Sequence, residues 1–186
     1  MLKYVEEFGK YVLIAGLKGA KIEDTEKFLK RFSKENLVEI QFFNACFVAG
    51  WQHVYFAVLN ALTAFKNKRN ISKNLAIETI LYASAQRQIR KALENLGIKP
   101  KTMELALIIV GEEPRTLKSA LNAIIRAAKA KRDDTVLELT DEKIAGIRKI
   151  FGISDLELEA VMKKGDLKKA LADIVIERMA LLATQV

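Results

Sequence analysis

The first part of the chain has the alternating, β-branched pattern of strands. Residues 2 to 17 form two extended segments separated by Gly9, which predicts a β-hairpin. A short surface helix is expected over residues 24 to 36, capped by Asp24 or Thr25, because Phe28, Leu29 and Phe32 recur at helical spacing. Strand character returns over residues 37 to 45.

Two long helices are predicted in the middle of the chain. Residues 48 to 66 are apolar nearly all round a helical projection, as a central helix covered on several sides requires. The second helix is expected to run from an N-cap at Ser72 to Leu96, because Gly97 and Pro100 end it. An interior strand over residues 102 to 111 follows, and then a helix with Pro114 in its first turn.

The last third of the chain is predicted to be one strand, over residues 135 to 139, followed by helices. Thr140 and Gly152 bound the first of these helices, Ser154 and Glu157 form a capping box, and Asp166 opens the last helix, which ends at Leu182. The pattern predicts an α+β fold: a small, mainly antiparallel sheet packed with helices. We expect one domain over residues 1–186, with a helical C-terminal segment at 140–186.

Composition fits a folded cytoplasmic protein. A hydrophobic fraction of 51% and a charged fraction of 29% argue against extended disorder. The single cysteine excludes an intramolecular disulfide and favours a reducing compartment. The apolar run near the N-terminus follows acidic residues and is too short for a signal peptide or a membrane span, so no membrane contact is expected.

Residues for catalysis are scarce. His53, the only histidine, lies in the most apolar helix, and Cys46, the only cysteine, precedes that helix without a motif that would join the two. The simplest interpretation is a packed cysteine and a histidine with satisfied hydrogen bonds. Soft metal ligands are too few for a zinc site, and no nucleotide-binding fingerprint is present. We therefore predict no catalytic site, no metal and no cofactor.

Basic residues are the stronger signal. The formal net charge is +8, which favours polyanionic partners. The basic residues gather in three places: "KNKRNISK" at 66–73, "RQIRK" at 87–91, and "RTLKSALNAIIRAAKAKR" at 115–132, which has six basic residues and no acid. Each is most often a solvated helix face, whereas two of them on one surface would indicate a nucleic-acid site.

Three stretches together resemble the kinase-binding regulatory subunit of the KEOPS tRNA-modification complex, the PRPK-binding protein family in its archaeal form. They are "LIAGLKGAKI", "IQFFNACFVAGWQHVYFAVLNALTAF" and "NLAIETILYASAQRQIRKALENLGIK", supported by "IERMALL" near the C-terminus. Ala85 stands where relatives often have glycine. The resemblance implies a non-catalytic subunit that supports an atypical kinase in threonylcarbamoyladenosine formation and binds the 3′ CCA end of tRNA.

Site residues follow from this resemblance together with the basic clusters. The expected tRNA contacts are Lys66, Lys68, Arg69, Lys73, Asn74, Gln86, Arg87, Gln88 and Arg90. Cations would neutralise phosphates, while the amides would hydrogen-bond the edges that single-stranded RNA exposes. The apolar last helix is expected to bind the kinase through Ile174, Val175, Ile176, Arg178, Met179 and Leu182.

Three alternatives remain open at this point. Ser84, Gln86 and Gln88 could instead face inward and bond buried backbone where the helix bends. The last helix could simply cover the sheet. The chain could also be a stand-alone RNA-binding module or, with less support, a small-molecule enzyme with a pocket around His53 and Cys46.

Overall fold

The computed structural model describes residues 1–33 and 37–184. The chain forms two compact units, each built from two stretches of sequence: unit 1 is Met1–Ala45 with Gly97–Val136, and unit 2 is Cys46–Leu96 with Leu137–Val186. An antiparallel sheet in unit 1 and helices in both units confirm the predicted α+β class. That residues 1–186 act as one domain stays a prediction.

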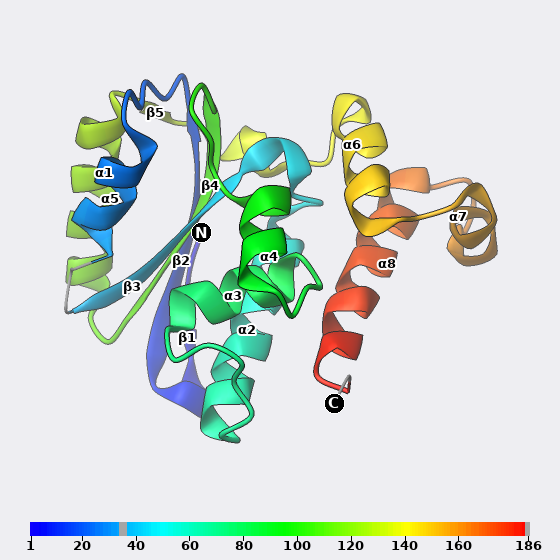
Figure 1. Cartoon of the computed structure of the whole chain (residues 1–186), viewed down its shortest axis with the longest axis horizontal. Helices are drawn as coiled ribbons and strands as arrows, with labels where there is room; N and C mark the ends of the chain where they lie inside the picture. The colour runs from blue at the N-terminus through cyan, green and yellow to red at the C-terminus, as the bar shows by residue number, and fades with distance from the viewer. Residues whose placement is uncertain (34–36, 185–186) are drawn as a thin grey trace. The chain divides into compact units, whose positions relative to one another are not determined.

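Unit 1 contains the sheet, in the order β1-β2-β4-β3 (Figure 1). Its strands are β1 (Leu2–Val5), β2 (Lys10–Lys18), β3 (Val38–Asn44), β4 (Glu104–Gly111) and the short β5 (Lys131–Arg132), which pairs with the end of β2. Neighbouring strands are antiparallel throughout. The N-terminal hairpin and the interior position of β4 are confirmed.

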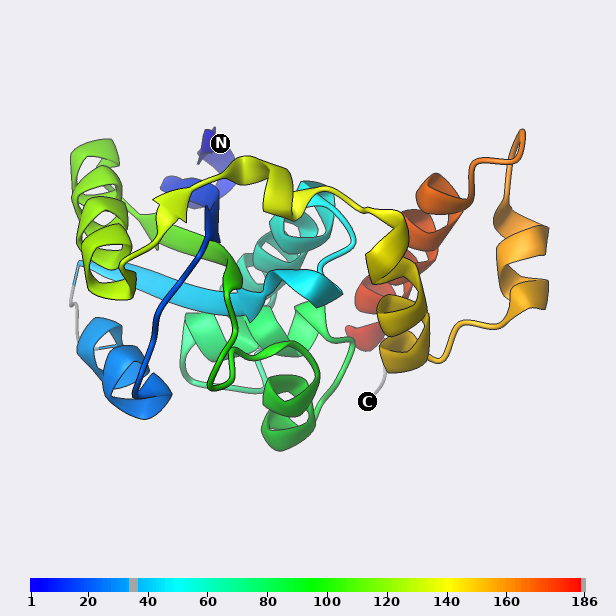
Figure 2. The same ribbon diagram turned by 90° about the horizontal axis from the view of Figure 1, so that it is seen from above.

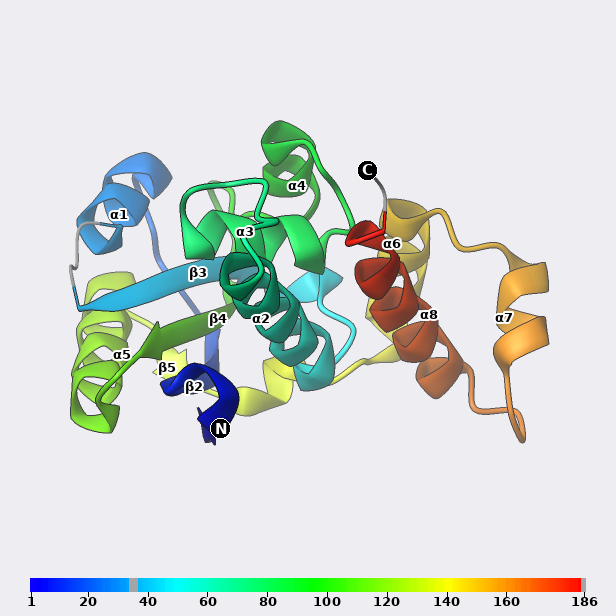
Figure 3. The ribbon, with the colours of Figure 1, turned by 90° about the horizontal axis from the view of Figure 1, so that it is seen from below.

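Helices α1 (Thr25–Phe32) and α5 (Pro114–Ala128) lie side by side on one face of this sheet (Figure 3). The Asp24 side chain caps α1 by accepting the Lys27 N–H at 2.9 Å, as the sequence predicts. The predicted end of this helix, residues 34–36, lies outside the described residues. Phe28 and Phe32 of α1 and Leu117 and Ile124 of α5 are buried in the core of unit 1. Each helix therefore has one apolar side on the sheet and one polar side in solvent.

Unit 2 is helical (Figure 2). Its helices are α2 (Trp51–Lys66), α3 (Leu75–Ala83), α4 (Ile89–Leu96), α6 (Asp141–Phe151), α7 (Asp155–Val161) and α8 (Leu167–Leu182). Helix α8 packs against α2, α3, α6 and α7. The predicted caps at Gly152, Ser154 with Glu157, and Asp166 are confirmed.

Two predictions are wrong. The single helix expected from Ser72 to Leu96 is two helices, α3 and α4, and the residue that caps α3 is Asn74, whose side chain accepts the Ile77 N–H. The strand expected over 135–139 is a 3-10 turn over Asp134–Leu137. The Asp133 carboxylate accepts both the backbone N–H and the hydroxyl of Thr135, and this local bonding competes with a strand.

Candidate functional site

The loop between α2 and α3 carries the first basic cluster, and a buried carboxylate holds it. Glu78 of α3 has no exposed surface. Its oxygens accept the backbone N–H of Ile71 at 3.0 and 3.1 Å and that of Ser72 at 2.7 Å. A buried carboxylate needs such partners, and the loop supplies them. The loop that presents Lys68, Arg69 and Lys73 is thus fixed to α3 from beneath.

A left-handed residue starts this loop. Lys68 has φ +55°, its N–H bonds to the Phe65 carbonyl, and the Arg69 N–H reaches back to the Ala64 carbonyl. These two bonds define a Schellman motif, in which the left-handed position is usually glycine. The strained lysine sets the direction in which Arg69 leaves the end of α2.

The turn between α3 and α4, just before the second basic cluster, contains a second Schellman motif. Ala85 has φ +49°, its N–H bonds to the Tyr82 carbonyl, and the Gln86 N–H bonds to the Leu81 carbonyl. The Ser84 hydroxyl is buried and donates to the Ile80 carbonyl at 2.8 Å. The bend that the alternative interpretation proposed for this stretch is therefore present, with Ser84 inward. Gln88, by contrast, is exposed.

His53 supports the same turn from below. Its ring is fully buried, Nδ1 accepts the Ala49 N–H at 3.0 Å, and Nε2 lies 2.7 Å from the Ala83 carbonyl. Because a carbonyl only accepts, Nε2 carries the proton. Burial lowers the pKa of His53 to about 4, against the opposing effect of the Ala83 hydrogen bond. A satisfied histidine is confirmed, and both ring nitrogens are occupied by structural bonds. The predicted packed cysteine is wrong, since Cys46 is exposed.

Arg69 and Arg87, from the two different basic clusters, line the same small groove of about 110 Å³. Asn60 of α2 and Asn67, the C-cap of that helix, also line it, as does Tyr82 of α3. Burial and the Glu78 carboxylate raise the pKa of the Tyr82 phenol, whereas Arg87 opposes that shift. Residues Leu182 and Ala183, at the end of α8, complete the groove. The structure thus brings the two clusters together at this point.

Charge in this part of unit 2 is strongly one-sided. Between residues 46 and 96 stand two acids, Glu78 and Glu94, and seven basic residues: Lys66, Lys68, Arg69, Lys73, Arg87, Arg90 and Lys91. Glu78 is buried beneath the loop, and Glu94 forms an ion pair with Arg90 at 2.8 Å. No exposed acid other than Glu94 offsets these cations within the stretch, so its surface suits an anion.

The other predicted RNA contacts fall into three groups. Lys66 is exposed as the last residue of α2, and Lys68, Lys73 and Gln88 are exposed on the loop or the turn. Arg90 is exposed and paired with Glu94 on α4, and Asn74 uses its side-chain oxygen as the cap of α3. Gln86 is half-buried and lines a different, larger pocket.

The predicted docking residues of α8 are mostly covered within unit 2. Val175 and Met179 have no exposed surface, and Ile174 and Leu182 are at most 4% exposed. Ile176 and Arg178 are half-buried. The large apolar residues that α8 does expose are Leu167 and Leu181, at 37% and 49%. Contact of the covered residues with a partner stays a prediction.

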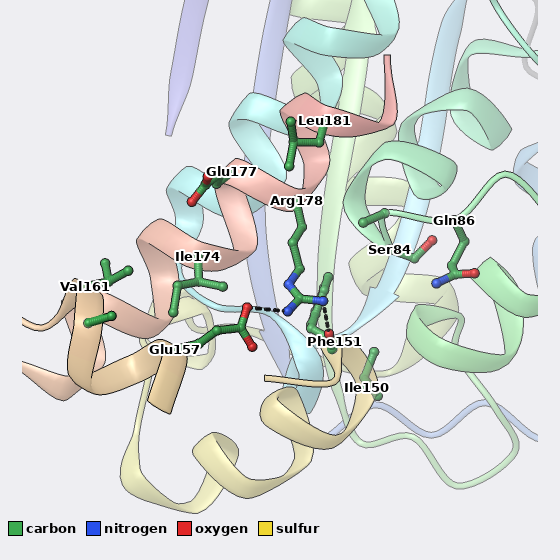
Figure 4. A pocket seen from close by; sticks show the side chains of 12 residues that line it. Ser84, Gln86, Ile150, Phe151, Glu157, Val161, Ile174, Glu177, Arg178 and Leu181 are labelled. Atoms are coloured by element: carbon green, nitrogen blue, oxygen red, sulfur yellow. Dashed lines mark hydrogen bonds and ion pairs between the residues drawn. The ribbon is translucent and has the colours of Figure 1, made fainter. Parts of the chain in front are cut away.

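A larger pocket, of about 460 Å³, lies beside Leu181 (Figure 4). Helix α8 contributes Ile174 and Arg178, α7 contributes Glu157, and further walls come from the end of α6 and the turn at Ser84 to Gln86. Arg178 crosses the pocket, donating to the Phe151 carbonyl and to Glu157, each at 2.6 Å. The backbone N–H of Ser154, and then Arg178, hold the pKa of Glu157 below its usual range. The pocket therefore has mixed walls around the Arg178–Glu157 ion pair: apolar side chains such as Ile174 and Leu181, and polar ones such as Gln86 and Glu177.

A family model described as "Kinase binding protein CGI-121" matches residues 20–183. The chain belongs to this family. The "Regulatory protein Cgi121" of Methanocaldococcus jannaschii is 32% identical over 143 residues, which cover 76% of this chain and 85% of that protein.

The CGI-121 family assignment confirms the predicted resemblance, and three residues within the matching stretches have structural roles in the segments that present the basic clusters. Glu78 fixes the loop, His53 fixes the end of α3, and Ala85 makes the left-handed turn. The role of Glu78 was not predicted, although an acid standing almost alone among seven cations could have suggested a buried anchor. In the described residues of this CGI-121 member, no cluster of His, Cys, Asp and Glu could hold a metal, and no helix could cross a membrane.

Proposed function

We propose that this chain is a non-catalytic regulatory subunit of a KEOPS-type complex, which binds the complex's atypical kinase and holds the single-stranded 3′ end of tRNA. The matched family is described as kinase binding, and the relative from Methanocaldococcus jannaschii is named a regulatory protein. The occupied nitrogens of His53 also fit a role without catalysis. The tRNA role rests on the resemblance and on the basic groove.

The observation that carries the RNA proposal is that Arg69 and Arg87 line one groove. Guanidinium groups bind phosphate in a fixed fork geometry, and the neighbouring Asn60 and Asn67 amides can bond base edges or riboses. The loop and the turn are held by Glu78 and His53 before any ligand arrives. Preorganisation of this kind reduces the entropy that binding must overcome.

The RNA proposal is tested by binding of intact tRNA and of tRNA trimmed of its CCA end to the purified protein. Trimming should weaken binding, and Arg69→Glu and Arg87→Glu should each weaken binding of intact tRNA by roughly tenfold, as expected when one charged hydrogen bond is removed. The negative slope of log K against log salt should become shallower by about 0.7 for each single-strand phosphate that the variant no longer neutralises.

Lys149→Glu is the matched control, because Lys149 is exposed on α6 and the charge change is the same. It should leave the affinity near that of the parent protein. Equal binding of trimmed and intact tRNA would reject the 3′-end model, and equal effects of Arg87→Glu and Lys149→Glu would reject the groove.

For the kinase, we propose docking on the exposed side of α8 and the larger pocket beside it. Leu181 is half exposed, lines the pocket with Ile174 and Arg178, and is therefore the apolar residue best placed to anchor a partner. This choice refines the prediction from sequence, which includes residues whose side chains are covered.

Leu181→Glu should weaken the complex with the kinase by at least about thirtyfold, which corresponds to the ~2 kcal/mol of a buried apolar anchor. Leu167→Glu is the control at the other end of the same helix, where a leucine is also exposed. Isothermal titration with the kinase separates them. If Leu181→Glu binds the kinase normally, the docking site is wrong, and tRNA binding without any kinase binding would indicate a stand-alone RNA-binding module.

A further inference from the structure

A row of cations runs along the outer side of α5 in unit 1. Arg115, Lys118, Arg126 and Lys129 are all exposed, and their spacing of 3, 8 and 3 residues places them on one narrow face of a helix with 3.6 residues per turn. Ser119 and Asn122, which share that face, are exposed and neutral. We call these four cations the basic stripe.

Fold stability does not account for the basic stripe. Arg115 stands in the first turn of α5, where the helix dipole disfavours a cation, and no acid occurs in that turn. Lys129 has an acidic partner, Glu23 at 4.0 Å. Within residues 1–33 and 37–184, the side chains of Arg115, Lys118 and Arg126 form no ion pair. These three cations are therefore available to an external anion.

The chemistry of this face selects the kind of anion. Every exposed residue of α5 is basic or neutral polar, and the apolar side of the helix is buried on the sheet. A protein partner would need apolar anchors at the centre of its interface, and an anionic membrane would need an apolar face to enter it. Phosphate backbone contacts need neither, because cations and polar groups suffice.

The length of the basic stripe suits several successive phosphates of a duplex arm. Arg115 and Lys129 are 14 positions apart, which spans roughly 21 Å at 1.5 Å per residue. That length corresponds to about six phosphates at roughly 3.4 Å of duplex axis for each phosphate of a strand.

We propose that the basic stripe binds the phosphate backbone of double-helical RNA, independently of sequence, as a second contact surface in addition to the groove at Arg69 and Arg87. The choice of RNA, and of the duplex arms of tRNA in particular, rests on the proposed function. The basic stripe would add affinity that does not depend on the RNA sequence, whereas the groove would recognise the single strand.

The experiment compares the double variant Lys118→Glu/Arg126→Glu with the parent protein on two probes: tRNA trimmed of its CCA end, and a single-stranded oligonucleotide ending in CCA. We expect at least about a tenfold loss of affinity for trimmed tRNA. The negative slope of log K against log salt should become shallower by about 2. Affinity for the oligonucleotide should stay unchanged. The control Lys149→Glu/Lys169→Glu, at exposed positions in unit 2, makes the same net charge change and should keep trimmed-tRNA binding.

Unchanged binding of trimmed tRNA by the α5 variant, or an equal loss in the control, would overturn the proposal. So would loss of kinase binding with intact RNA binding, because the basic stripe would then serve a protein. The proposed 3′-end function fails by a different result, namely equal binding of trimmed and intact tRNA together with no effect of Arg87→Glu.

Discussion

Two stretches of unit 2 carry nearly the same number of cations and use them in opposite ways. Residues 46 to 96 hold seven basic residues against two acids, and residues 137 to 186 hold eight against nine. In the second stretch Arg148 pairs with Asp155, Lys168 with Asp141 and Arg178 with Glu157. In the first stretch Arg90 pairs with Glu94, and the other acid, Glu78, binds backbone N–H groups instead.

The charge of each surface depends more on the partners of its cations than on their number. Exposed ion pairs contribute little to stability, but they neutralise the surface on which they lie. In the first stretch Glu78 lies beneath the loop, so it fixes the backbone and leaves the outer surface positive. The first stretch therefore has five more cations than acids, whereas the second has one more acid than cations and uses Arg148, Lys168 and Arg178 in ion pairs.

Removing the carboxylate beneath the loop should have the largest effect. Glu78→Ala should lower the free energy of unfolding by about 3 kcal/mol, because hydrogen bonds to a buried charged group are removed. It should also weaken tRNA binding, since the cations of the loop are no longer held. Urea denaturation and tRNA titration measure the two effects. Glu78→Gln, which keeps one acceptor oxygen, should fall between, and a stable Glu78→Ala protein would show that the loop is held by other contacts.

Acid should act on the first stretch through His53. The pKa of this histidine is about 4 in the folded protein, against 6.5 for the exposed group. The neutral form is favoured by folding, so its stabilisation is complete above pH 6.5 and is lost as pH falls toward 4. The loss amounts to about 3 kcal/mol at ~1.4 kcal/mol per pH unit.

Denaturant unfolding of the parent protein and of His53→Gln at pH 7 and pH 4 checks this. His53→Gln is the control, because the chain then has no histidine to titrate. The carboxylates titrate in both proteins and cancel in the difference. Parallel pH curves for the parent and the variant would contradict the assignment.

A pair of arginine variants tests the comparison most directly. Arg178→Ala should lower the free energy of unfolding by about 1–2 kcal/mol, since Arg178 bonds the Phe151 carbonyl and Glu157, and should leave tRNA affinity unchanged. Arg87→Ala should do the reverse. Thermal unfolding and tRNA titration of both variants test this. If one variant is the more impaired in both stability and tRNA affinity, the two stretches are not functionally distinct.

The smallest effect is expected at the turn between α3 and α4. Ala85→Gly should stabilise the protein by about 0.5 kcal/mol, because the left-handed conformation costs alanine ~1–2 kcal/mol while glycine loses ~0.5–1 kcal/mol more entropy on folding. The control Ala145→Gly, at an exposed position in α6, should destabilise by roughly 1 kcal/mol. Denaturant midpoints compare them, and destabilisation by Ala85→Gly would show that the alanine methyl group contributes to the turn.

Most of the fold follows from local sequence signals. The hairpin, the interior strand β4, and the caps at Asp24, Gly152, Ser154 and Asp166 are confirmed because each depends on residues close together in the chain. The break between α3 and α4 was expected only as one alternative, because an alanine occupies a left-handed position that normally calls for glycine.

The candidate site was predictable in its residues and not in its geometry. Two basic clusters stand out in the sequence, but only the chain's path brings Arg69 and Arg87 to one groove. For α8, an apolar surface wider than one stripe is equally the mark of a helix covered on several sides, as Val175 and Met179 are. Burial within the chain and burial by a partner leave the same sequence pattern, so the exposed Leu181 emerges only from the structure.

The last turn of α8 lines the basic groove through Leu182 and Ala183, while Leu181 faces the larger pocket. Residues of one helical turn therefore line both cavities. A protein held at one cavity and a nucleic acid held at the other would contact the same few residues, so any effect of one on the affinity of the other would be reciprocal and equal by thermodynamic linkage.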